Sequence, residues 1–262
     1  MPCSNTLRPI VLTLSTYGTA TRYALSDQWV AIDDGAEAGM DVNIVNVTGN
    51  FQCRPATQLA AVRTDAPSAP SPWSGSVVST AAHHHFSESN VGGTGNLYAQ
   101  FGVAYELSSG SGLGAAQVIL TPTLKSCVRM LPSSQIMVNP GMVTTTDINC
   151  QAMTQFLPAV GLSLVKCAFI VTDNASDYLE YQLMMRSAVN PNAPNAWQTV
   201  EAGWDNPSSS ADERNTGELS APAGASLSSN LLFQLGVGFR MKSGAGGNPR
   251  AVIRAIPAVV YV

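Results

Sequence analysis

Three adjacent histidines, His83, His84 and His85, are the residues of this sequence best suited to chemistry. Three imidazoles could bind a transition metal, or three chains could pool them around a symmetry axis. Neighbouring side chains of an extended chain point to opposite faces, however, so one chain cannot easily direct all three at one ion. Because the matching region later in the chain has no histidine, we predict a polar loop here rather than a metal site.

Other residue clusters give no stronger indication of chemistry. Two acidic clusters could offer oxygen ligands to calcium: one comprises Asp33, Asp34 and Glu37, the other Asp173, Asn174 and Asp177. Neither has the EF-hand spacing, and turns account for both. The glycine runs at 110–114 and 244–247 lack the lysine of a phosphate-binding loop, and no G-x-S-x-G or H-E-x-x-H motif occurs. We therefore predict a protein that is not an enzyme and uses no cofactor.

Three tryptophans could take part in binding. Trp73 and Trp197 each lie three residues after a P-x-A-P segment. Exposed, they could stack against sugar rings; the alternative is that each anchors its proline loop with the indole half buried. Their repetition favours anchoring. Trp204 lies in a stretch without a counterpart in the first half, so it is the better candidate for an exposed contact.

The elements that must position these residues are strands. Residues 96–119 (NLYAQFGVAYELSSGSGLGAAQVI) match residues 230–253 (NLLFQLGVGFRMKSGAGGNPRAVI) without a gap, at an offset of 134. Both stretches alternate strictly at the start, which predicts a long strand with one face in a core. The glycine-rich run that follows predicts a turn into a second strand. We expect Phe101, Val103, Val237 and Phe239 to be buried. Gln234 and Arg240, on the opposite face, should tolerate substitution unless a neighbouring chain covers them.

An earlier match extends the repeat to the whole chain. At an offset of 124, Gln58 aligns with Gln182 and Trp73 with Trp197. The offset then grows by ten residues, an insertion that we place in the polar segment 202–229. Each half supplies seven or eight short strands with turn signals and no convincing helix. The sequence thus predicts an all-β chain of two tandem, duplicated, jelly-roll-like β-sandwich domains, residues 1–126 and 127–262.

Composition narrows the class of protein. Charged residues make up 11% of the chain, far below the usual ~25%. A net charge of −4 argues against direct nucleic-acid binding. The N-terminal stretch lacks the apolar core of a signal peptide, and no segment is apolar enough for a membrane span, so we expect synthesis in a cytoplasm. Five cysteines without C-x-x-C spacing predict free thiols rather than a disulfide framework.

Taken together, these properties resemble those of bacteriophage virion building blocks. The shared features are few lysines, a β composition rich in Ala, Gly, Ser, Thr and Asn, no leader, and a duplicated unit of about 130 residues. Two fused sandwiches look particularly like the small double jelly-roll capsid proteins. That resemblance implies a structural protein of the virion whose partners are copies of itself and other virion proteins. Decoration, tail and fibre proteins fit almost as well.

Two further classes remain open: a tandem carbohydrate-binding, lectin-like module, with its tryptophans as stacking residues, and, third, an enzyme. Under the virion hypothesis the contacts should lie where the halves differ, in segments 79–95 and 202–229. The candidate interaction residues are His83, His84, His85, Trp204, Asp212, Glu213 and Arg214.

Overall fold

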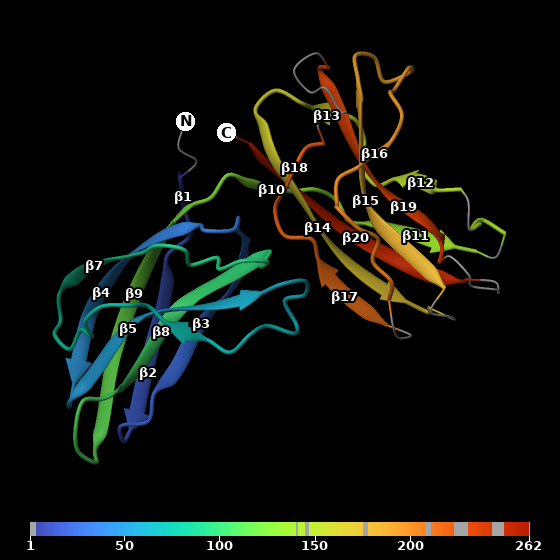
Figure 1. Cartoon of the computed structure of the whole chain (residues 1–262). Coiled ribbons are helices and arrows are strands. Elements are labelled where there is room, and N and C mark those ends of the chain that lie inside the picture. The colour runs from blue at the N-terminus through green and yellow to red at the C-terminus, as the bar shows by residue number, and fades with distance from the viewer. Residues whose placement is uncertain are drawn as a thin grey trace. The chain divides into compact units, whose positions relative to one another are not determined.

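The computed structural model describes residues 4–139, 141–144, 147–174, 178–207, 211–222, 230–242 and 249–261. Every regular element among these residues is a strand (Figure 1). The prediction of an all-β chain is confirmed. The chain divides into two compact units, Met1–Cys127 and Val128–Val262.

The first unit is a sandwich of two antiparallel sheets. Its strands are β1 (Ser4–Thr6), β2 (Ile10–Tyr17), β3 (Arg22–Ala31), β4 (Glu37–Thr48), β5 (Phe51–Ala60), β6 (Ser71–Pro72), β7 (His83–Glu88), β8 (Tyr98–Leu107) and β9 (Leu113–Lys125). One sheet has the order β1-β9-β4-β7, with β2 also paired to β9, and the other has the order β3-β8-β5-β6. From β2 to β9 this is the order of an eight-stranded jelly roll.

One apolar core joins the two sheets of the first unit. Strand β9 and the Glu37–Ile44 part of β4 bury every second side chain, as expected for strands with one solvated face. Met40 and Val118 from one sheet belong to the same buried cluster as Phe51, Phe101 and Val103 from the other. The predicted burial of Phe101 and Val103 is confirmed.

The second unit has the same strand order. Its strands are β10 (Val128–Met130), β11 (Ser134–Val138), β12 (Asn149–Ala152), β13 (Leu157–Pro158), β14 (Leu162–Thr172), β15 (Leu179–Ala188), β16 (Gln198–Thr199), β17 (Asp212–Asn215), β18 (Leu219–Ser220), β19 (Leu232–Met241) and β20 (Ala251–Tyr261). One sheet runs β10-β20-β14-β17, with β11 on β20 and β18 on β14. The other runs β12-β19-β15-β16, with β13 on β19. Two short strands, β17 and β18, thus take the place of β7, and β12 with β13 take the place of β3.

The core of the second unit contains Val237 and Phe239, as predicted. The opposite face of β19 departs from the prediction, because side chains of the same unit cover it. Gln234 is buried and accepts a hydrogen bond from Arg186 Nε at 2.8 Å. Arg240 is paired with Glu180 at 2.7 Å. Neither residue is the freely substitutable surface position that the alternation alone indicated.

The strand registers of the two units correct the sequence alignment that was predicted at an offset of 124. Strands β8 and β19 correspond at the predicted offset of 134. In β5, the Pro55 carbonyl accepts from the Trp73 N–H at 2.8 Å; in β15, the Leu183 carbonyl accepts from the Val200 N–H at 3.1 Å. Val200 therefore occupies the place of Trp73, and the predicted pairing of Trp73 with Trp197 is wrong. The additional residues are spread over several turns rather than confined to 202–229.

Two local predictions also need correction. Residues His83–Glu88 are not a loop but the strand β7, paired with β4, since an edge strand accommodates polar side chains on its outer face. Cys127 is disulfide-bonded, whereas Cys53, Cys150 and Cys167 are free thiols as predicted. Among the described residues no helix is long and apolar enough to span a membrane.

Candidate interaction surfaces

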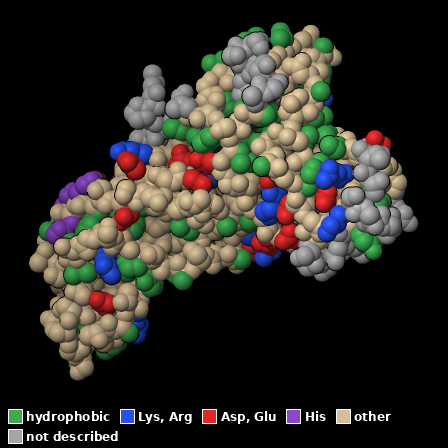
Figure 2. Space-filling view, in the orientation of Figure 1, with side chains coloured by type: hydrophobic (Ala, Val, Ile, Leu, Met, Phe, Trp, Pro, Cys, Tyr) green, Lys and Arg blue, Asp and Glu red, His purple; other side chains and the backbone are tan. Residues whose placement is uncertain are grey.

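Two of the three histidines lie together on the outer face of the first unit. His83 and His85 point outward from β7, and both meet Asp41 of the neighbouring strand β4. His85 Nδ1 lies 2.7 Å from Asp41 Oδ1, and His83 Nε2 lies 3.5 Å from the same oxygen. The side chains of His83, His85 and Asp41 are all solvent-accessible. The histidines stand out on a surface with few charges (Figure 2). Within the described residues, no group of His, Cys, Asp and Glu side chains is arranged to hold a metal ion.

His84 points to the opposite face of β7. It is paired with Val42, and its Nε2 atom is buried without a hydrogen-bond partner. In the second unit the equivalent position of β17 is Arg214, which is paired with Phe169 of β14. The sequence comparison missed this equivalence, because a histidine and an arginine share no identity and the spacing between strands differs.

Arg214 is held inside the second unit by carboxylates and aromatic rings. Its guanidinium pairs with both carboxylate oxygens of Glu201, and its Nε lies 2.8 Å from Asp205 Oδ2. It also lies over the rings of Phe169 and Tyr181, 5.2 Å and 5.0 Å from their centroids. Burial alone would lower the pKa of Arg214, but the bonds to Glu201 outweigh it and raise the pKa above its ordinary value. Arg214 therefore acts as an internal clamp.

Asp212 and Glu213 lie on the same strand as Arg214. Asp212 is half-buried and Glu213 is exposed. Glu213 corresponds in register to His83. Each directly precedes the inward-pointing residue of its edge strand, Arg214 in β17 and His84 in β7. The strands His83–Glu88 and Asp212–Asn215, one from each predicted segment, therefore lie at equivalent edges of the two units.

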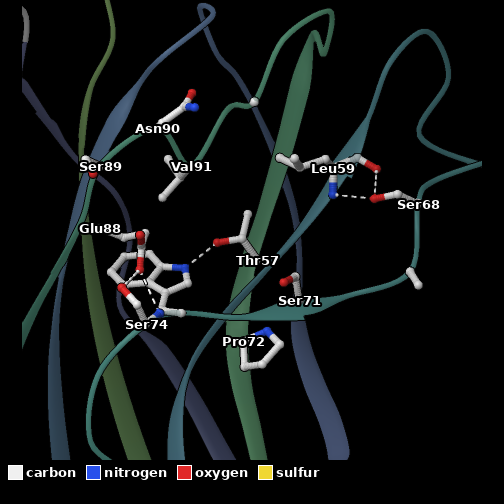
Figure 3. A pocket seen from close by; sticks show the side chains of 13 residues that line it. Thr57, Leu59, Ser68, Ser71, Pro72, Ser74, Glu88, Ser89, Asn90 and Val91 are labelled. Atoms are coloured by element: carbon white, nitrogen blue, oxygen red, sulfur yellow. Dashed lines mark hydrogen bonds between the residues drawn. The ribbon is translucent and has the colours of Figure 1, made fainter.

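Trp73 lines a pocket of about 400 Å³ in the first unit, and Figure 3 shows Thr57, Ser74 and Glu88 around that pocket. Trp73 is only 4% exposed, and its indole N–H donates to Thr57 Oγ1 at 2.6 Å. Next to it, Glu88 accepts hydrogen bonds from the backbone and the hydroxyl of Ser74. Trp73 thus anchors its proline-rich segment, as predicted, and offers no open ring to a sugar.

Trp197 and Trp204 lie in the second unit, and each is stacked with an arginine. Arg186 lies 4.5 Å from the ring centroid of Trp197, and Arg240 lies 4.2 Å from that of Trp204. The Trp197 indole rests on Gly236, where a Cβ atom would come within 2.6 Å of it. Both tryptophans are half-buried, so their contacts lie mainly within the unit.

An apolar patch at one end of the second unit was not foreseen. Val160, Val189 and Leu231 are 78%, 65% and 62% exposed. They lie at neighbouring strand ends, because Leu232 is paired with both Pro158 and Ala188 and the Leu231 carbonyl accepts from the Ala159 N–H at 2.9 Å. We call these three residues the end patch.

The end patch sits at a repeated position of the sequence. Leu231 is identical to Leu97 of the first unit, yet Leu97 is fully buried. The usable sequence signal was the doublet Leu231-Leu232, which places apolar residues on both faces of one strand end. Identity between the halves concealed that signal, since it predicted the same environment for both leucines.

The buried free cysteines and the Asp33-Asp34 turn are not arranged for catalysis. Burial raises the pKa of Cys53 to about 12, and burial also raises that of Cys167, so both remain protonated. Asp33 and Asp34 accept hydrogen bonds from the backbone of Cys127 and Gly95, as turn residues do.

Comparison with known proteins places the chain in no family. No family model matches the sequence, and no curated protein matches it. Similar solved structures include a tandem CBM22 domain of Paenibacillus barcinonensis Xyn10C, with 8% identity, 94% of this chain and 93% of that chain covered, and a TM-score of 0.31. A chain of infectious bursal disease virus, Gt strain, has 8% identity, coverage of 99% and 73%, and a TM-score of 0.35. A chain of Sulfolobus Turreted Icosahedral Virus has 9% identity, coverage of 99% and 90%, and a TM-score of 0.26. Likenesses this remote do not indicate a function.

Proposed function

We propose that this protein is a non-enzymatic structural protein that assembles with copies of itself or on a particle, as a capsid or capsid-decoration component of a virion. The observation that carries this proposal is the end patch. Three aliphatic side chains at neighbouring strand ends, each more than 60% exposed, form an apolar patch of the kind through which proteins contact one another. Covering them would gain roughly 25 cal/mol for each Å² removed from water.

The rest of the surface supports the same function. Only 11% of the residues are charged, and uncharged polar side chains with backbone dominate the visible surface (Figure 2). Lysine and glutamate, which interfaces tend to exclude, are therefore scarce over broad areas. Such a surface loses little hydration when another chain covers it.

We assign the polar part of the contacts to the two equivalent edges. In the first unit these residues are His83 and His85 with Asp41; in the second they are Asp212 and Glu213. Arg214 and His84 point inward and act by holding their strands in place. Trp204, half-buried against Arg240, contributes at most one edge of its ring.

We further infer that the units, residues 1–126 and 127–262, are two copies of one ancestral domain. The shared strand order and the matching β8 and β19 support this inference. Duplicated domains of one chain can occupy similar but non-identical positions in a shell, which would account for the divergence between Leu97 and Leu231.

The test is the effect of the end patch on assembly. The double variant V160N/L231N should shift the sedimentation profile toward the single chain, because it removes the apolar surface but leaves the strands intact. The matched control is Met137→Asn, which changes an exposed side chain on β11, outside the end patch. An unchanged profile for V160N/L231N, or an equal shift for the control, would contradict the role of the patch.

Glycan binding is a second candidate, favoured by the pocket beside Trp73. Ser71, Ser89 and Asn90 line this recess, whose volume lies at the small end of ligand sites. Asn90 adopts a φ of 59°, so Asn90→Gly removes its amide without strain. Retention on a glycan array that is lost in this variant would support the candidate, and no retention of the parent protein would exclude it.

A further inference from the structure

Strand β2 of the first unit is a long, uncharged edge strand. Its sequence, IVLTLSTY, contains no charged residue, no proline and no glycine. Among the described strands it pairs with β9 alone. Such an edge presents a row of unpaired N–H and C=O groups to any other extended chain.

Other edge strands of the described chain carry features that block such pairing. Strand β3 has a break in register between Leu25 and Trp29, and β6 is two residues long and contains Pro72. Strand β7 carries histidines and Glu88. In the second unit β11 has five residues, and β12, β13, β16, β17 and β18 are shorter still. Strand β2 is the long edge without a protective feature.

The ladder identifies which backbone groups of β2 are free. The Leu7 N–H donates to the Pro122 carbonyl, and the Ile44 N–H donates away from β9, to the Ala82 carbonyl. The N–H and C=O groups of even-numbered residues of β9 therefore point toward β2. They form hydrogen bonds with the even-numbered residues of β2, as in the pair Leu14 and Ala116. The odd-numbered residues of β2 are Val11, Thr13, Ser15 and Tyr17. Their N–H and C=O groups point away from β9, in the plane of the sheet and toward its free edge.

We propose that β2 pairs antiparallel with β2 of a second copy of this chain, with Leu14 opposite Leu14. This inference rests on the proposed function of self-assembly and names one contact that performs it. The register places Val11, 60% exposed, opposite Tyr17, 66% exposed, so that the two large apolar side chains of the strand cover each other. Aliphatic and aromatic cross-strand pairs of this kind stabilise antiparallel ladders.

The same register is consistent on both faces of the sheet. Thr13 lies opposite Ser15 on the outer face, and Leu12 lies opposite Thr16 on the core face, next to the Leu14 pair. A shift by one residue would set outer side chains against core side chains, which the burial pattern of β2 forbids. With no charge on either strand, no repulsion opposes the pairing.

Cysteine cross-linking tests the register. A hydrogen-bonded antiparallel pair has Cα atoms ~5.5 Å apart, within the range that a disulfide spans. A mixture of T13C and S15C proteins should give a disulfide between residues 13 and 15 of different chains under mild oxidation, identified by peptide mass spectrometry. Neither variant alone should form a 13–13 or a 15–15 link. Absence of the mixed link, or links within each variant alone, would overturn the proposed register.

Proline substitution tests the contact independently. Thr13→Pro removes an N–H that points out of the sheet, and an edge strand tolerates proline at such a position; Thr13→Val keeps the N–H and is the matched control. Losing about 1.4 kcal/mol of main-chain bonding weakens association about tenfold. We expect this loss for T13P, with an unchanged melting temperature, and none for T13V.

The outcomes separate this inference from the proposed function. If the parent protein assembles, but T13P assembles equally well and no 13–15 link forms, the β2 contact is wrong while self-assembly stands. If the parent protein is monomeric at every concentration, both fail.

Discussion

Replacing Phe239 by alanine probes the core of the second unit most directly. Phe239 is fully buried in β19, paired with Tyr181 of β15 on one side and Asn149 of β12 on the other. It belongs to an apolar cluster drawn from both sheets of its unit. Neighbours on two flanking strands restrict collapse around the shortened side chain, so we expect a cavity to remain.

The expected cost follows from that cavity. Truncation of a buried phenylalanine to alanine costs about 3–5 kcal/mol, against a total stability of roughly 5–15 kcal/mol for a domain. For a unit of this size each kcal/mol shifts the melting temperature by ~3–6 °C. The transition of the second unit should therefore fall by about 9–30 °C. The first unit has its own core, so its transition should not move.

Differential scanning calorimetry measures both transitions in the full chain. Met137→Ala, at an exposed position of β11, is the control and should shift neither transition by more than about 0.5 kcal/mol. Phe101→Ala should lower the transition of the first unit instead. A melt of F239A that matches the parent would refute the assignment of the buried face. A single transition that moves as a whole would refute the independence of the units.

Three further predictions concern single contacts. Arg214→Ala leaves Glu201 buried without its partner and should destabilise the second unit by about 3 kcal/mol in urea unfolding; a loss below 1 kcal/mol would show that the clamp is not structural. Gly236→Ala forces a Cβ against the Trp197 indole and should cost about 1–3 kcal/mol with a red shift in tryptophan fluorescence, whereas an unchanged spectrum would contradict the stacking. The Cys53 thiol, with its pKa raised to about 12, should not react with Ellman's reagent at pH 8 in the folded protein and should react quickly in urea. Its rate should rise about tenfold per pH unit, and rapid reaction of the folded protein at pH 8 would contradict its burial.

The sequence predicted the fold where alternation was long. The eleven-residue alternation that contains Phe239 identified the β strand and its buried face, because a period of two has one structural meaning over that length. The earlier register could not be predicted, since short identities across turns of unequal length aligned Trp73 with Trp197. Backbone hydrogen bonds aligned Trp73 with Val200 instead. The length of each turn follows only from the hydrogen bonds between paired strands, which the sequence does not show.

The candidate site was predictable only in part. The sequence correctly marked the segment containing His83 and the segment containing Arg214 as places where the halves differ. It could not show that both are edge strands in equivalent positions, nor that Arg214 points inward while His83 points outward. Burial of Leu97 and exposure of Leu231 likewise depend on neighbouring segments rather than on the residue itself.

The mass of the protein in solution, followed by sedimentation velocity over a wide range of concentration with electron microscopy of the same samples, tests self-assembly most directly. We predict species larger than a single chain that grow with concentration toward a closed particle or a regular oligomer. A single-chain mass at every concentration, with no particle in the micrographs, would contradict the proposal.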